Sequence, residues 1–438
     1  MPTEPATART EVAAAFPQRG KIFYGWWIVA AGVVAIAVNS SVYFYGMAVF
    51  FTPLIQEFGW SRTALAGAFS IARMQAGIAG PLTGAAIDRW GPRRMMMIGM
   101  VMVAAGFGLL GRVTSLEAFY AIFIIFLSIG SGLSASPPVG AAIANWFSRR
   151  RGLAMGLLMC GGGVGGFIAA GLGFLINAYG WRTTMDIIAV AILVTGLPAA
   201  AVIRHRPEPY GWLPDGAPPD PSQRKPAAGA STPRVEADRS FRPREAIATS
   251  AFWVLSTMFA LRNLTTSGAL VHLPALMVDR GHPLEVAATI AGLVALFSII
   301  GRFACGWLAD RVDERYLVAA TFAFASLSLE VLALGTTPLH VATFVVGYGI
   351  SYGGSVPLTM SMVARYFGHR WFGTVYGLSQ FVIIWGSVGG PLLAGYGYDT
   401  TGSYETAIHI FAVANIVGLA LAFMVRRPSR PALRPALS

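Results

Sequence analysis

The sequence predicts an all-α membrane protein with twelve transmembrane helices, arranged as two pseudo-symmetric six-helix bundles. Hydrophobic residues make up 55% of the 438 residues and charged residues only 12%, about half the charged share of a soluble domain. The apolar residues are spread over segments of roughly 20 to 25 residues, long enough to cross a bilayer. A motif that ends the second segment recurs about half a chain later, as expected for a duplicated half.

The apolar segments and the stretches between them divide the chain into five parts. The spans are expected at 25–50, 62–86, 95–113, 118–143, 153–179, 183–203, 250–277, 284–307, 316–336, 341–363, 373–396 and 404–425. This gives an N-terminal bundle over 21–203 and a C-terminal bundle over 246–427, with tails at 1–20 and 428–438. The proline-rich stretch 204–245 has the composition of a linker, without core-forming residues. The first twenty residues lack the apolar core of a signal peptide, so the first span should remain in the protein.

The net charge of +12 is explained by topology rather than by nucleic acid. With the N-terminus in the cytoplasm, 25 of the 32 Lys and Arg residues fall on the cytoplasmic side, and only Arg62, Arg112, Arg182 and Arg280 fall in outer loops. This is the positive-inside pattern. We therefore expect a multi-pass protein of the plasma (inner) membrane, with both termini cytoplasmic, the lipid bilayer as its surroundings and no nucleic-acid partner.

The duplicated motif places Gly, Asp, Arg and Arg at the same spacing in both halves. Gly84 is followed by Asp88, Arg89 and Arg93, and Gly306 is followed by Asp310, Arg311 and Arg315. A second pair of motifs, over 146–156 and 366–377, repeats in the same way. With this doubled signature, residues 20–427 resemble the major facilitator superfamily, whose fold consists of two six-helix halves.

A narrower resemblance lies in the first span. Tyr24-Gly25-Trp26-Trp27 and Val49-Phe50-Phe51 are similar to motifs of the monocarboxylate transporters and of their relatives, the oxalate/formate exchangers. The run from Phe297 to Arg302 is similar to the segment in which those families place a substrate-binding arginine. The resemblance implies transport of a small organic anion by alternating access.

The resemblance also suggests a mechanical role for the repeated motifs. Asp88 and Asp310 would each cap the N-terminus of a helix from the facing half, where the helix dipole favours a negative charge. The two aspartates would also pair with neighbouring arginines and hold the cytoplasmic side shut, and Arg89, Arg93, Arg311 and Arg315 are assigned to this gate. The alternative is a static loop staple.

Three arginines lie inside predicted spans: Arg73, Arg262 and Arg302. A charge near the bilayer centre costs about 3 kcal/mol on insertion scales, so it is usually retained for a task. Because few acids accompany these cations, a small anion is the expected ligand, and a guanidinium can hold a carboxylate through two parallel hydrogen bonds. Arg302 is the predicted substrate-binding residue, the alternative being an ion pair with Asp310. For Arg73 and Arg262, an interhelical hydrogen-bond hub is the favoured interpretation.

The remaining candidates are neutral or titratable groups in the spans. His272 is expected to contact substrate or to carry the coupled proton; the alternative is a histidine bonded to a backbone carbonyl. Ser298 and Tyr45 stand where the animal monocarboxylate carriers have an Asp and a Lys, which puts the proton-coupling scheme of those carriers in doubt. The other predicted binding residues are Asn39, Tyr352 and Tyr376.

One motif is rejected. The glycines from Gly161 to Gly166 fit a dinucleotide fingerprint, but they lie inside an apolar span and are assigned to close helix packing. We expect no cofactor, metal site or enzymatic activity. The predicted function is transport of a small monocarboxylate such as lactate or pyruvate, coupled to a proton, by a monomer. An oxalate/formate-type exchanger and a non-transporting membrane sensor remain alternatives.

Overall fold

The computed structural model describes residues 22–60, 62–216, 240–335 and 337–428. Its secondary structure is helical, with no β-strand in these residues. The first half contains α2 (Gly25–Asn39), η1 (Ser40–Gly46), α3 (Met47–Phe58), α4 (Arg62–Trp90), α5 (Pro92–Leu110), α6 (Leu116–Ile122), η2 (Phe123–Ser128), α7 (Ile129–Ser134), α8 (Ser136–Trp146), α9 (Arg151–Ala170) and α10 (Leu172–Val202).

The second half consists of long helices. They are α12 (Ser250–Asp279), α13 (Leu284–Leu308), α14 (Glu314–Leu334), α15 (Pro338–Phe367), α16 (Phe372–Thr401) and α17 (Glu405–Met424). The described parts of the linker carry three short elements: η3 (Glu208–Tyr210), η4 (Pro214–Gly216) and α11 (Pro243–Ile247).

The helices follow the twelve expected spans, and the largest differences lie at two glycines. The first span continues beyond the expected residue 50 to Phe58, where Gly59 ends it with a φ of 67°. The expected break between the fifth and sixth spans falls inside α10. There Gly180, with a φ of 77° and a ψ of 161°, turns the chain. A positive φ is accessible to glycine without steric cost, which explains why both turns are made at this residue.

Nine helical segments of the described chain are long and apolar enough to cross a membrane. Helices α4, α9 and α12 are not among these segments. Two of them carry an arginine near the middle, Arg73 in α4 and Arg262 in α12. The protein is a multi-pass membrane protein in which some helices carry polar groups into the interior.

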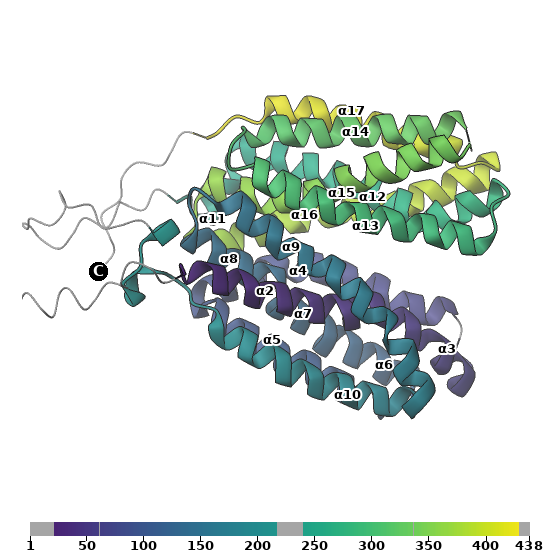
Figure 1. Cartoon of the computed structure of the whole chain (residues 1–438), viewed down its shortest axis with the longest axis horizontal. Helices are drawn as coiled ribbons and strands as arrows, with labels where there is room; N and C mark the ends of the chain where they lie inside the picture. Colours follow the sequence, from purple (N-terminus) through teal and green to yellow (C-terminus); the bar gives the residue numbers. More distant parts are fainter. Residues whose placement is uncertain (1–21, 61, 217–239, 336, 429–438) are drawn as a thin grey trace, which may run out of the picture.

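The helices form two bundles that meet at one end of the molecule. Figure 1 shows α2–α10 in one bundle and α12–α17 in the other, close together at the end where the linker lies and apart at the opposite end. One apolar core fills the first bundle and continues across this near end into Phe252, Phe367 and Phe372 of the second. A separate core, which includes Leu273, Phe344 and Phe411, belongs to the second bundle alone. The near end also carries Asp88 and Asp310, and we call it the Asp-Arg end.

Glycines allow the two bundles to approach closely at two symmetric crossings. Gly84 of α4 lies against Gly373 of α16, and a Cβ atom on Gly373 would stand 2.6 Å from the carbonyl oxygen of Gly84. Gly306 of α13 lies against Gly152 of α9, and a Cβ atom on Gly306 would stand 2.7 Å from the carbonyl oxygen of Gly152. Such distances exclude any side chain, so backbone packs directly on backbone.

The described linker residues pack on the helices, which corrects the expectation that the linker lacks core-forming residues. Phe241 is buried in the main core and its backbone N–H donates to the Phe367 carbonyl oxygen at 2.8 Å. At the start of the linker, Trp212 packs edge-on against Phe23, and the Arg204 guanidinium lies between the rings of Tyr24 and Tyr210. Residues 217–239 fall outside the described chain.

Candidate functional site

Arg302 lies between the two bundles with little of its charge compensated. It belongs to α13 and is 7% exposed. Its Nη1 donates to the carbonyl oxygen of Met159, in α9 of the other bundle, at 3.1 Å. Its Nε is buried without a hydrogen-bond partner, and the Tyr352 ring centroid lies 5.8 Å from its Cζ. The guanidinium therefore keeps donors for a ligand, because one carbonyl oxygen cannot satisfy five N–H groups.

Carboxylates do not balance this charge. Among the ion pairs of the described residues, none includes Arg302. Asp310, the alternative partner considered from the sequence, binds Arg365 instead at 3.2 Å. A buried guanidinium without an acid favours an anionic ligand, since the ligand supplies the missing counter-charge.

One glycine of the rejected fingerprint, Gly162, makes room for Arg302. Gly161 and Gly165 pack against α2, as expected from the sequence. Gly162 instead faces the guanidinium, because a Cβ there would stand 3.2 Å from Arg302 Nη1 and 3.8 Å from Ser40 Oγ. The sequence analysis assigned all these glycines to helix packing and therefore missed this one's role. The periodicity of the glycine run could have indicated it, since neighbouring residues of a helix point to different faces.

The two aspartates of the repeated motif cap helices of the facing bundle. Asp88 accepts hydrogen bonds from the backbone N–H groups of Gly373 and Thr374, at 2.9 and 2.7 Å, at the start of α16. Asp310 accepts from Gly152 and Leu153, at 2.7 and 2.8 Å, at the start of α9. These are charge-assisted bonds at helix N-termini, where the dipole favours a carboxylate. The contacts are those the sequence analysis expected, and they join the bundles in both directions.

The arginines of the motif do not pair with these two aspartates. Arg89 and Arg311 lie beside the rings of Trp90 and Trp307. Arg315 binds Asp313 at 2.9 Å, and Arg93 is exposed at the start of α5. The arginine that pairs with Asp310 is Arg365 of α15, which also binds Glu314 at 3.3 Å. Nothing in the sequence motif marks Arg365, which lies in a different helix.

Burial and hydrogen bonding act in opposite directions on the acids at this end. Burial raises the pKa of Asp310, while the two α9 N–H groups and Arg365 act to lower it. The hydrogen bond from Arg315 lowers the pKa of the more exposed Asp313. Burial therefore distinguishes the two carboxylates, although both have an arginine partner.

A linker residue missed by the sequence analysis binds beside Asp310. Asp215 accepts hydrogen bonds from the backbone N–H groups of Ser148, Arg149 and Arg150, at 3.0, 2.7 and 3.3 Å, just before α9. Its φ of 59° is the only positive value among the described non-glycine residues. The sequence Pro214-Asp215-Gly216 is a turn signature, so the turn was predictable but its partners were not.

Comparison with known proteins identifies the fold and the family. The sequence profile of the Major Facilitator Superfamily matches residues 29–387. The chain belongs to this superfamily. Because the match covers most of both bundles, the protein is a membrane transporter with the superfamily fold, which confirms the fold class expected from the sequence.

Curated members of the superfamily resemble the whole chain. Human monocarboxylate transporter 11 is 29% identical over 423 residues, which cover 92% of this chain and 82% of the relative. The oxalate:formate antiporter of Oxalobacter formigenes is 26% identical over 428 residues, 93% of each protein. The narrower resemblance read from the first span is therefore confirmed.

Solved superfamily structures show the same fold. The human organic anion transporter MFSD10 (TETRAN) aligns with a TM-score of 0.70 at 15% identity and covers 91% of this chain and 99% of that one. The transporter FucP in its outward conformation aligns with a TM-score of 0.67, with the same identity and coverage. At this identity the likeness concerns the fold alone.

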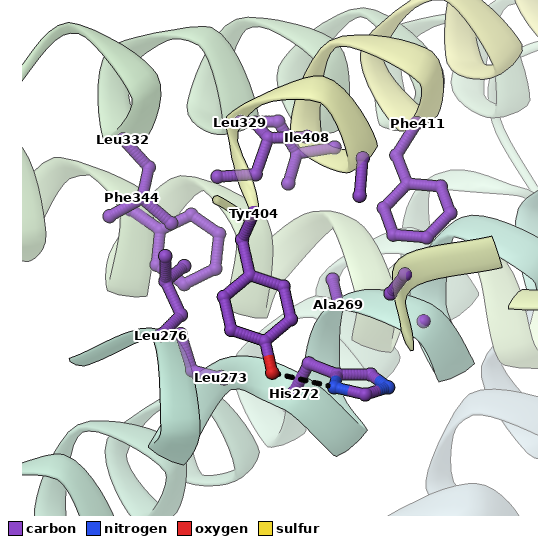
Figure 2. Close-up of a pocket in the computed structure, with 13 residues that line it drawn as sticks. Ala269, His272, Leu273, Leu276, Leu329, Leu332, Phe344, Tyr404, Ile408 and Phe411 are labelled. Atoms are coloured by element: carbon purple, nitrogen blue, oxygen red, sulfur yellow. Dashed lines mark hydrogen bonds between the residues drawn. The ribbon is translucent and has the colours of Figure 1, made fainter. Parts of the chain in front are cut away.

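His272 lies inside the second bundle, where its ring faces Tyr404 (Figure 2). Its Nδ1 is 3.1 Å from the Tyr404 hydroxyl and its Nε2 is 3.1 Å from the Pro391 carbonyl oxygen. It borders a cavity of about 20 Å³, which is also lined by Tyr404 and otherwise by apolar residues such as Phe344 and Phe411. A carbonyl oxygen only accepts, so Nε2 carries hydrogen and Nδ1 accepts from Tyr404 in the neutral ring. Among the described residues, His272 and Arg302 share no hydrogen-bond partner.

Four other predicted binding residues have partners within the protein. The Ser298 hydroxyl donates to the Ala295 carbonyl oxygen at 2.6 Å, and Asn39 accepts from Ser131 at 2.8 Å. Tyr376 stacks on Phe372 with ring centroids 5.5 Å apart, while Tyr352 faces Arg302 as described above. Of these four, only Tyr352 is brought to Arg302 by a direct contact.

Two residues considered from the sequence fall outside the description. The side chains of Tyr45 and Arg73 are not among the described parts of the chain, although their backbones belong to η1 and α4. The roles suggested for them stay predictions.

Proposed function

We propose that this transporter carries a small monocarboxylate such as lactate or pyruvate, and that Arg302 holds the carboxylate. The observation that supports this most is the Arg302 guanidinium, which is buried between the bundles with an unpartnered Nε and no acid. A carboxylate replacing the Met159 carbonyl could accept two parallel N–H groups from one guanidinium. The names of the relatives, monocarboxylate transporters and an oxalate:formate antiporter, are consistent with this substrate class.

The proposed transport cycle is alternating access. Asp88 and Asp310 close the Asp-Arg end, which we assign to the cytoplasm from the distribution of Lys and Arg. Both termini are then cytoplasmic and the bundles rock about the Arg302 region. We further propose that the carrier works as a monomer in the plasma membrane, since each bundle supplies one side of the site.

Arg302 is tested by uptake into proteoliposomes. Radiolabelled lactate uptake driven by an inward proton gradient should be abolished in Arg302→Ala and strongly reduced in Arg302→Lys, because an ammonium cannot replace the planar fork. Arg112→Ala is the matched control, since Arg112 forms an exposed ion pair with Asp186 and both residues belong to the first bundle. Unchanged uptake by Arg302→Ala would exclude the assignment.

His272 is our candidate for the coupled proton. Protonated Nδ1 can donate to the Tyr404 oxygen once that hydroxyl has turned, so the ring can gain a proton without losing either hydrogen bond. His272→Gln should therefore lose uptake driven by a pH gradient and retain exchange of internal for external lactate. Retention of gradient-driven uptake would assign the proton to another group, such as the substrate itself.

Exchange of two organic anions is the second candidate function, favoured by the relative from Oxalobacter formigenes. Uptake into vesicles without internal substrate supports symport, whereas strict dependence on internal formate or oxalate supports exchange. The absence of flux for every small carboxylate would contradict both candidates.

A further inference from the structure

Arg262 is a second buried cation without an acid. It lies midway along α12 and is 2% exposed. Its Nε donates to Ser355 Oγ at 3.3 Å, its Nη1 to Asn415 Oδ1 at 3.1 Å and its Nη2 to Ser351 Oγ at 2.7 Å. The three partners, from α15 and α17, are all neutral, and none of the ion pairs of the described chain includes Arg262.

These neutral partners fix the guanidinium but leave its charge uncancelled. Hydrogen bonds from hydroxyl and amide groups solvate a cation, yet a net positive charge remains in a region of low dielectric constant. The rings of Phe322 and Tyr348 lie 5.8 Å from its Cζ and exclude water. Three neutral acceptors cannot cancel a full positive charge, so the electrostatic effect of Arg262 extends beyond its hydrogen bonds.

Helix α15 lies between Arg262 and the proposed substrate site. Its Ser351 and Ser355 bind Arg262, while the intervening Tyr352 faces Arg302. Both uncompensated cations therefore act on the same region, and in a medium of low dielectric constant their potentials add there.

We propose that Arg262 is a charge-selectivity residue, which acts through space on the anion held by Arg302 and favours ligands with more negative charge. It does not touch the substrate, because all three of its nitrogens bind neighbouring side chains. This inference rests on the proposed function, and it adds a prediction about which anions bind more tightly.

Asn415→Asp tests the proposal with the guanidinium left in place. The substitution is isosteric and turns the 3.1 Å hydrogen bond into an ion pair that cancels the charge. Electrostatic energy scales with ligand charge, so a loss of about tenfold in lactate affinity should accompany a loss of about a hundredfold for oxalate. The affinities are measured as inhibition constants against lactate uptake in proteoliposomes.

Asn415→Ala is the matched control, because it removes the same hydrogen bond without adding a charge. Its ratio of oxalate affinity to lactate affinity should equal that of the wild type. Equal changes for both anions in Asn415→Asp, or identical ratios in the two variants, overturn the proposal. If oxalate does not compete in the wild type, the tenfold difference in lactate affinity between the two variants decides.

A second pair of variants covers the case in which Asn415→Asp does not fold. Arg262→Lys keeps the charge and should keep the ratio of oxalate affinity to lactate affinity. Arg262→Gln should lower this ratio, as Asn415→Asp does. A purely structural role would change the yield of folded protein without separating the two ratios. The proposed function is judged separately, by Arg302→Ala.

Discussion

Replacing Asp310 by alanine should open the Asp-Arg end of the molecule. The Asp310 side chain, 9% exposed, accepts two backbone N–H groups at the start of α9, at 2.7 and 2.8 Å, and binds Arg365 at 3.2 Å. In the closed state, the alanine variant leaves these donors facing a methyl group. Each orphaned donor costs about 1–3 kcal/mol, whereas in the open state water can satisfy them.

The expected magnitude follows from these contacts. Because Asp215 and the Asp88 cap remain, we expect the closed state to be destabilised relative to the open state by about 3 kcal/mol, near the low end for two orphaned N–H groups. At about 1.4 kcal/mol per factor of ten, this raises the open-to-closed ratio roughly a hundredfold. The closed state is also held by the glycine crossings, so the variant should fold and should still populate both states.

Hydrogen exchange measured by mass spectrometry can distinguish a gate from a local staple. If Asp310 holds the bundles together, exchange should accelerate by about a hundredfold at Gly152 and Leu153 and also at Gly373 and Thr374, which Asp88 protects at the other crossing. Asp313→Ala is the control, because within the described chain the hydrogen bonds of the Asp313 side chain go to Arg315, its near neighbour in the sequence. Acceleration confined to the start of α9 would refute gating and leave the static staple.

Three further predictions concern the same end of the molecule. Gly84→Val should prevent closure, because any side chain there meets the Gly373 backbone; trypsin should then cleave the Asp-Arg end faster than in the wild type. Asp215→Ala should accelerate exchange at residues 148–150 at least tenfold while lactate uptake continues, since that carboxylate binds only within one bundle. Burial raises the pKa of Asp310 in the closed state, so the closed state binds a proton more tightly than an open state with ordinary pKa. Acidification through this raised pKa should therefore favour closure, and Asp310→Ala should lose that pH dependence in exchange experiments corrected for intrinsic rates.

The features predicted correctly are those written locally in the chain. Span positions depend on runs of apolar residues, and the capping roles of Asp88 and Asp310 depend on a motif that occurs twice. The missed features depend on contacts between distant segments. Arg365 meets Asp310 only because α15 ends beside the start of α9, and Asp215 reaches residues 148–150 only because its turn docks there. Neither partner carries a local signature that a sequence pattern could reveal.

The candidate site was likewise predicted only in part from the sequence. Position inside an apolar span marked three arginines as costly in the membrane, and the resemblance of the segment from Phe297 to Arg302 to the known families singled out Arg302 among them. The sequence could not show that His272 faces Tyr404 and Pro391 rather than Arg302, because a helix of this length brings different turns to different neighbours. The placement of a titratable group along a span therefore indicates little about which cavity it serves.

The difference between the halves can be located at one symmetric crossing. Gly80 of α4 lies against Gly377 of α16, and a Cβ on Gly80 would stand 2.9 Å from the Gly377 carbonyl oxygen. At the equivalent crossing, Arg302 lies against Gly156 of α9, where an added Cβ would stand 2.7 Å from the Arg302 carbonyl oxygen. The backbone contact is similar in both, but only the second crossing has room for a side chain, which runs along α9 to Met159 and Gly162. Duplication thus supplies two equivalent crossings, and the anion site we propose occupies the one in which a glycine is replaced by arginine and a facing glycine leaves space for it.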